Sequence, residues 1–167
     1  MKKLKISSLA LGIIVAGGSS SIYAQLMFSQ YVDGANNQKG LEIFNPDAVQ
    51  VNLADYEIRQ YSNGKTTSSS SINLKGVLAP NQKFLIGRGE LQETLGDRVH
   101  QKANLAFNGD DTLVLYYKGT AVDRFGILGE EPANGWGMQK PYAKENSFSR
   151  KAKKMMSQVL IPKHLLT

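Results

Sequence analysis

Two adjacent carboxylates, Asp110 and Asp111, come closest in this sequence to a metal-binding pattern. They follow Asn108-Gly109 directly before an apolar strand pattern, and neighbouring carboxylates in a turn can bind Ca²⁺ together with backbone carbonyl oxygens. Aspartates at such positions also stabilise turns by accepting hydrogen bonds from backbone N–H groups. We favour this structural role, so the sequence predicts no metal ion and no cofactor, with Asp110 and Asp111 as weak metal candidates.

Other catalytic groups are scarce. The two histidines, His100 and His164, are not spaced as a pair for zinc or for proton transfer, no serine lies in a Gly-x-Ser-x-Gly elbow, and there is no cysteine. We therefore predict no catalytic residue and no enzyme. The alternative hypothesis is a metal-dependent extracellular nuclease or phosphodiesterase, or a vestigial fragment of one, because phosphodiester hydrolysis needs several carboxylates around an ion. Its carboxylates would be those of Glu42, Asp110, Asp111 and Asp123.

The net charge of +6 is not spread over the chain. Of the 20 basic residues, three lie in the first five positions and five lie between positions 150 and 163, so residues 25–149 hold 12 basic residues against all 14 acidic ones. A surface that follows phosphates normally shows an excess of Lys and Arg across the whole domain. The sequence therefore predicts a slightly acidic body with basic ends.

The basic carboxyl end, residues 150–167, carries an apolar pattern with helical spacing. Such a basic amphipathic helix can contact anionic lipid or DNA, but about ten residues form only a marginal helix in water. We favour a frayed, truncated or non-native end over a functional helix. The residues that would contact an anionic partner are Arg150, Lys151, Lys153 and Lys154.

The amino end has the layout of a secretory signal peptide. Lysines at positions 2, 3 and 5 precede an uncharged apolar run over residues 6–16, which is shorter than the roughly 20 residues needed to span a bilayer. The predicted cleavage site lies between Ala24 and Gln25, since Ala24 is small. We therefore expect the mature protein to be secreted, either extracellular or periplasmic.

From residue 26 onward, short runs of alternating apolar and polar residues are separated by Gly, Asn, Asp and Ser, as is typical of β-strands. Asn63-Gly64 and Lys118-Gly119 predict tight turns. Residues 88–106 leave three alternatives open: a loop, a helical turn or a short strand near Val99. Trp136, between two glycines, fits a core position better than a stacking platform for a sugar or base. The clear strands are predicted at 26–32, 40–45, 56–61, 83–87, 112–117 and 121–127.

These motifs also follow one another in a recognisable order. The segments that carry the pattern are residues 28–34, 36–46, 51–58, 61–64, 107–115, 122–126 and 135–137. Their succession resembles the lamin-tail domain of secreted bacterial proteins. The resemblance implies an immunoglobulin-like β-sandwich, of a kind that often precedes the catalytic domain of extracellular nucleases or phosphatases.

Taken together, these observations predict an all-β chain with an immunoglobulin-like β-sandwich of the lamin-tail type. We expect a signal peptide at 1–24, the sandwich at 25–149 and a basic tail at 150–167. The predicted function is that of a secreted, non-catalytic binding or accessory module, associated with a nuclease and contacting nucleic acid or a cell-surface polymer. After residue 152 the sequence departs from the polar, acidic continuation that the resemblance implies, so we expect a truncated relative of a longer nuclease.

Overall fold

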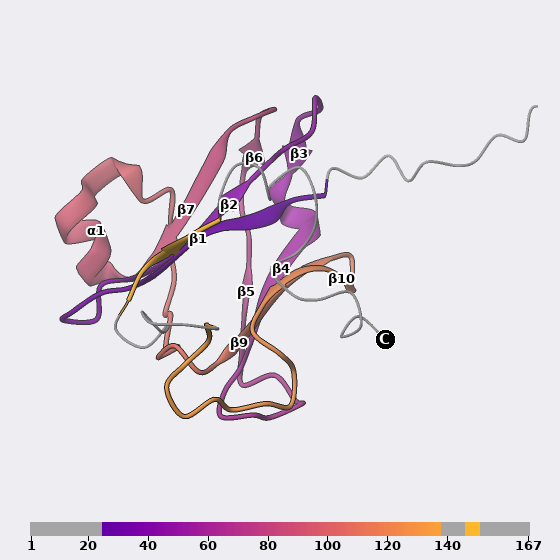
Figure 1. Cartoon of the computed structure of the whole chain (residues 1–167). Coiled ribbons are helices and arrows are strands. Elements are labelled where there is room, and N and C mark those ends of the chain that lie inside the picture. Colours follow the sequence, from indigo (N-terminus) through magenta and orange to yellow (C-terminus); the bar gives the residue numbers. More distant parts are fainter. Residues whose placement is uncertain (1–24, 138–145, 151–167) are drawn as a thin grey trace, which may run out of the picture.

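A computed structural model describes residues 25–137 and 146–150 as an all-β sandwich, which confirms the predicted fold class (Figure 1). One sheet has the strand order β11-β1-β2-β7-β8, and the second has the order β10-β9-β4-β5. Neighbouring strands are antiparallel except for β7 and β8. The first sheet consists of β1 (Met27–Asp33), β2 (Lys39–Phe44), β7 (Lys83–Gly87), β8 (Gln101–Lys102) and β11 (Phe148–Ser149). The second consists of β4 (Tyr56–Tyr61), β5 (Ser70–Asn73), β9 (Thr112–Tyr117) and β10 (Thr120–Phe125).

Short elements complete the chain. A two-stranded ladder joins β3 (Val51–Asn52) to β6 (Val77–Leu78), and a 3-10 turn, η1 (Leu53–Asp55), leads into β4. The ambiguous segment contains a helix, α1 (Gly89–Leu95), a second 3-10 turn, η2 (Gly96–Arg98), and then β8. The helix contacts β2 and β7 and lies at the left in Figure 1. In the described part of the chain, no helix is long and apolar enough to cross a membrane.

The core lies between the inner faces of the two sheets, where the alternating apolar residues meet. The ring of Tyr31 packs between two phenylalanines, with centroid distances of 4.8 Å to Phe107 and 4.4 Å to Phe125. Leu41, on β2, and Leu115, on β9, are fully buried in the same cluster. Because the chain has no cysteine, this packing and the backbone ladders stabilise the fold without disulfides.

The segment after β10 folds back across the end of β9 through Trp136. The indole Nε1 donates to the carbonyl of Asp111 at 2.9 Å, and the Trp136 amide donates to the carbonyl of Gly109 at 2.9 Å. The half-buried Trp136 ring packs against the core and covers Gly126. The structure therefore places Trp136 in the packing of the sandwich.

Gly126→Ala should lower the free energy of unfolding more than Gly119→Ala does, by about 1–3 kcal/mol. Both glycines have left-handed φ angles, 91° and 83°, so both substitutions strain the backbone. A methyl group at position 126 would also meet Trp136 at 2.7 Å, whereas nothing lies within 4 Å at position 119. Urea unfolding followed by the fluorescence of the single tryptophan measures both losses; equal losses would contradict this role for Trp136.

Candidate functional site

The predicted metal candidates are buried parts of the loop that enters β9. Asp111 accepts hydrogen bonds from the side-chain amide of Gln60 at 2.9 Å and from the backbone N–H of Asn63 at 3.1 Å. Its neighbour Asp110 is also buried, at 4% exposure. Burial is the main cause that raises the pKa of Asp111, and the nearby Asp110 adds to it. These contacts give Asp111 a structural role that links its loop to β4 and to the turn at Asn63, and the absence of a metal ion stays a prediction.

The carboxylates of the alternative nuclease hypothesis do not converge on one point. Glu42 accepts a hydrogen bond from the hydroxyl of Ser29 at 2.6 Å and pairs with Lys83 at 2.9 Å. Asp123 lies on β10 and pairs with Arg150. Across residues 25–137 and 146–150, no three acidic or histidine side chains form a group that could hold a metal ion.

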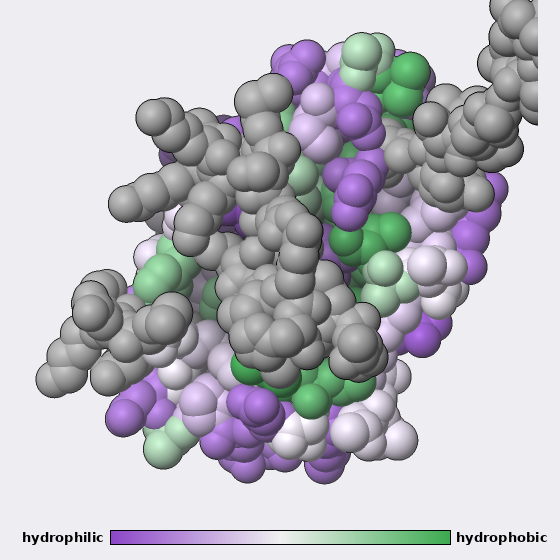
Figure 2. Space-filling model, turned by 45° about the vertical axis from the view of Figure 1, so that its right-hand side comes forward, coloured by the Kyte–Doolittle hydropathy of each residue, from purple (hydrophilic) through white to green (hydrophobic). Residues whose placement is uncertain are grey.

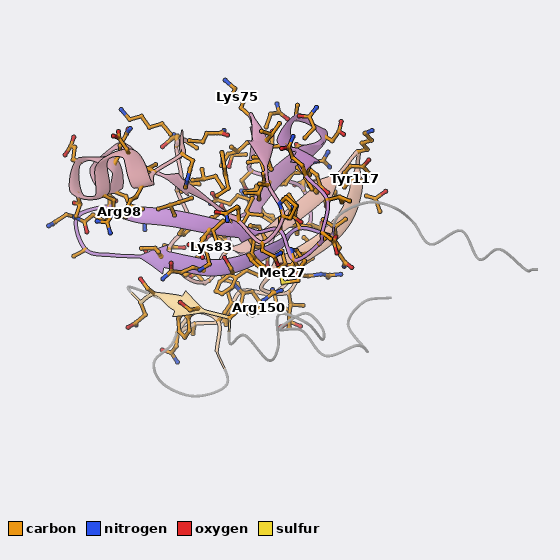
Figure 3. All side chains as sticks on the ribbon, turned by 90° about the horizontal axis from the view of Figure 1, so that it is seen from above. Met27, Lys75, Lys83, Arg98, Tyr117 and Arg150 are labelled. Carbon is orange, nitrogen blue, oxygen red and sulfur yellow. The ribbon has the colours of Figure 1, made fainter. Side chains whose placement is uncertain are left out.

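Arg150 is a correction to the sequence analysis. It was predicted to contact an anionic partner from a flanking tail, but its side chain is only 3% exposed and its Nη2 donates to both carboxylate oxygens of Asp123, at 3.0 and 3.2 Å. Its backbone N–H also donates to the carbonyl of Ser29 at 2.8 Å, so Arg150 belongs to the sandwich (Figure 3). The remaining predicted contacts, Lys151, Lys153 and Lys154, lie outside the described residues, as does Ala24 of the predicted cleavage site.

The strongest candidate for a ligand surface is on the outer face of the second sheet. Cross-strand pairing aligns Arg124 of β10, Val114 of β9 and Arg59 of β4 in one row. Val114 is only 4% exposed, yet it lies outside the core cluster, so it is buried on the outer face between the two arginines. Tyr116 and Tyr61 lie on the same face. We call Arg59, Tyr61, Val114, Tyr116 and Arg124 the outer arginine–tyrosine patch.

Internal contacts hold this patch in place. The guanidinium of Arg59 lies 4.4 Å from the centre of the Tyr116 ring, and its Nε and Nη2 each donate to Glu57 at 2.9 Å. The hydroxyl groups of Tyr61 and Tyr116 are 2.7 Å apart. Burial, followed by the bond with Tyr61, raises the pKa of Tyr116 to about 12, so this phenol stays neutral at physiological pH. The patch therefore combines two guanidinium groups, one of them paired with Glu57, with aromatic rings that internal contacts hold in place.

The chemistry of the patch matches that of a surface for acidic polymers. Guanidinium groups bind phosphate and carboxylate oxygens through charge-assisted hydrogen bonds. The half-exposed ring of Tyr116 can stack on a nucleobase or a sugar face, whereas Tyr61 is buried, at 5% exposure, and holds Tyr116 in place through its hydroxyl group. Arg59 keeps 35% of its side-chain surface exposed although it is paired with Glu57, and Arg124 is half-exposed with no ion pair to another described residue.

Sequence reasoning missed this patch because its members come from three strands. Alternation indicates that Arg59 and Tyr61 face away from Ile58, and that Arg124 faces away from Asp123. It cannot show that β9 lies between β4 and β10 with Val114 opposite both arginines. That information is in the register of the ladders.

Comparison with known families matches residues 19–129 to the lamin tail domain. The chain belongs to the lamin tail domain family. A comparison with curated proteins finds no match. Membership of the lamin tail domain family indicates an immunoglobulin-like, non-catalytic module. All strands of the second sheet, and with them the outer arginine–tyrosine patch, lie within the matched region, whereas β11 and Arg150 lie beyond it.

Substitution of Asp111 in this lamin tail domain tests its buried structural role through pH. Because the folded-state pKa is raised, the carboxyl group contributes stability below its unfolded pKa of about 4, and this is lost as pH rises through the folded value. Asp111→Asn has no carboxyl group to titrate at this position and lacks this contribution to stability. The free energy of unfolding of the wild type minus that of Asp111→Asn should therefore fall between pH 4 and pH 7 in urea titrations. The exposed Asp97→Asn serves as control, and a difference that rises with pH would contradict burial as the cause.

Proposed function

We propose that this lamin tail domain protein is an exported accessory module that holds an acidic polymer against its outer arginine–tyrosine patch. The observation that carries the proposal is the alignment of Arg124 and Arg59 on either side of Val114, next to the Tyr116 ring. Two guanidinium groups beside an immobilised aromatic ring can contact the acidic groups and the planar units of one polymer chain. No catalytic step is part of this function.

The distribution of charge in the folded domain supports a basic role that the sequence count hides. Four of the 13 acidic residues in the described segments are buried, namely Asp33, Asp110, Asp111 and Asp123, whereas only one of the 11 basic residues, Arg150, is buried. Lysines such as Lys75 project into solvent (Figure 3). The surface therefore lacks the excess of negative charge that a count of charged residues gives for residues 25–149. This removes an electrostatic barrier to polyanions.

The scarcity of exposed large hydrophobic residues in the described segments also favours polymer binding over a large apolar interface. The strongly exposed large hydrophobic residues of the described segments are Val49, Val77 and Leu128. On the face shown in Figure 2, hydrophobic residues form small patches among hydrophilic ones. Large apolar patches mark protein interfaces, and scattered single residues do not.

Single-stranded nucleic acid is the preferred ligand, because its phosphates match Arg59 and Arg124 and its bases match the accessible ring of Tyr116. The resemblance to modules that accompany extracellular nucleases supports the same choice. An acidic cell-surface polysaccharide shares the charged groups but offers sugar faces in place of bases. Export through a signal peptide at residues 1–24 gives the module access to either polymer, and the intact mass of the protein collected outside the cell tests that export.

Fluorescence anisotropy with a labelled single-stranded oligonucleotide tests the proposal. Tyr116→Ala should weaken binding by about 1–3 kcal/mol through lost base stacking. Arg124→Gln should lower the slope of log K against log salt by about 0.7, the contribution of one phosphate contact on a single strand. Lys102→Gln, on β8 of the other sheet, is the matched control and should leave affinity nearly unchanged.

Two further arms decide between outcomes. A variant that ends at Arg150 should bind as the full chain does; loss of binding would assign the contact to residues 151–167 and overturn the patch. A labelled acidic polysaccharide in the same assay shows whether sugar chains are preferred over nucleic acid. Failure to bind either polymer at low salt would refute the proposed function. Binding by Tyr116→Ala and by Arg124→Gln that equals wild-type binding would refute it as well.

A further inference from the structure

The segment Phe148–Arg150 lies on the sandwich in the way that a bound peptide lies on a receptor. β11 adds to the edge of β1, with Phe148 opposite Tyr31 and Ser149 opposite Gln30. The backbone N–H of Arg150 continues the ladder by donating to Ser29. Extended peptides bind exposed sheet edges in this manner, with backbone bonds for affinity and pockets for alternate side chains.

The alternate side chains of this segment enter the body of the domain. Phe148 packs against the core, and Arg150 places its guanidinium on the buried carboxylate of Asp123. Ser149, between them, is exposed. The segment thus presents an aromatic residue, an exposed residue and an arginine to this edge.

Apart from the segment itself, the groups that form the site come from residues before 130. Its lining residues Phe28, Tyr31, Leu41 and Phe125 enclose a residual cavity of about 20 Å³ beneath the segment, and all of them precede residue 130. The same is true of Asp123, whose carboxylate also accepts a hydrogen bond from the backbone N–H of Phe28 at 2.7 Å. These groups all lie within the lamin tail match at 19–129, whereas the occupant comes from outside it.

We propose that the β1 edge together with Asp123 is a strand-acceptor site for segments of the pattern aromatic–any–arginine, and that Phe148–Arg150 is its intramolecular occupant. Charge complementarity selects the arginine, because the carboxylate of Asp123 is only 2% exposed with the segment in place, and a buried carboxylate is stabilised by a hydrogen-bonded cationic partner. A peptide segment of the same pattern can exchange with the resident one. This site lies apart from the outer arginine–tyrosine patch and does not depend on the proposed polymer.

Cleavage of the folded chain tests the acceptor site while every residue is still present. A protease site is placed within residues 138–145, the protein is cut after folding, and the fragment that carries Phe148–Arg150 is followed by gel filtration. The wild-type fragment should stay bound to the sandwich. Phe148→Ala and Arg150→Gln leave the receptor part unchanged, and each should release the fragment. For Arg150→Gln the affinity should fall roughly 30-fold or more, because the buried carboxylate loses its charged partner.

An excess of a synthetic peptide of residues 146–150 should displace the wild-type fragment, and the same peptide with Arg150 replaced by Gln should not. Asp123→Asn in the receptor part should release the fragment while the Trp136 fluorescence of the folded domain is kept. Release of the wild-type fragment on cleavage, or equal retention of the wild-type and Arg150→Gln fragments, would overturn the proposal. A failure of polymer binding by the patch leaves these outcomes unaffected.

Discussion

The architecture depends on the carboxylate of Asp123, which is buried where the two sheets meet. Asp123 lies on β10; its carboxylate accepts a hydrogen bond from the N–H of Phe28 on β1 and forms an ion pair with Arg150. Burial is the main cause that raises its pKa, while Arg150 and the backbone N–H of Phe28 oppose the rise. A buried charge with one partner removed typically costs 3–5 kcal/mol. Three stretches that are distant in the sequence, around residues 28, 123 and 150, are therefore held to one geometry.

Burial of acidic residues also determines what the surface can do. Asp111 stabilises the loop before β9, and Asp33 pairs with Lys39 at the end of β1, so these carboxylates are turned inward. Basic side chains largely stay at the surface. The outer arginine–tyrosine patch lies on the outer face of the second sheet, and residues such as Leu115 on the inner face pack into the core and so fix the register of its strands. Core packing and the proposed binding thus use opposite faces of the same strands.

Much of the fold could be predicted from the sequence because alternation and turn residues are local signals. The strand at 112–117 and the Lys118-Gly119 turn were predicted as observed, with positive φ angles of 46° and 83° at the turn. Residues 88–106 could not be placed, because α1 has few apolar positions and depends on contacts with β2 and β7: Leu91 packs onto Gly40 and Gly87. That packing is invisible until the strands are assembled.

The site was harder to predict than the fold, since its charges are paired over long sequence separations. Arg150 precedes a run of lysines and was grouped with them, although its partner Asp123 is 27 residues away. A local count of charges cannot distinguish a buried arginine from a solvated one. The same limit applies to Arg124 and Arg59, which become neighbours only through Val114.

A double-mutant cycle on Asp123 and Arg150 tests most directly whether this buried pair closes the sandwich. Urea unfolding of Asp123→Asn, Arg150→Gln and the combined variant gives the coupling free energy. Removal of both charges should cost less than the sum of the single losses, with a coupling of about 1 kcal/mol or more. Additive losses, or an Arg150→Gln variant as stable as the wild type, would contradict the account.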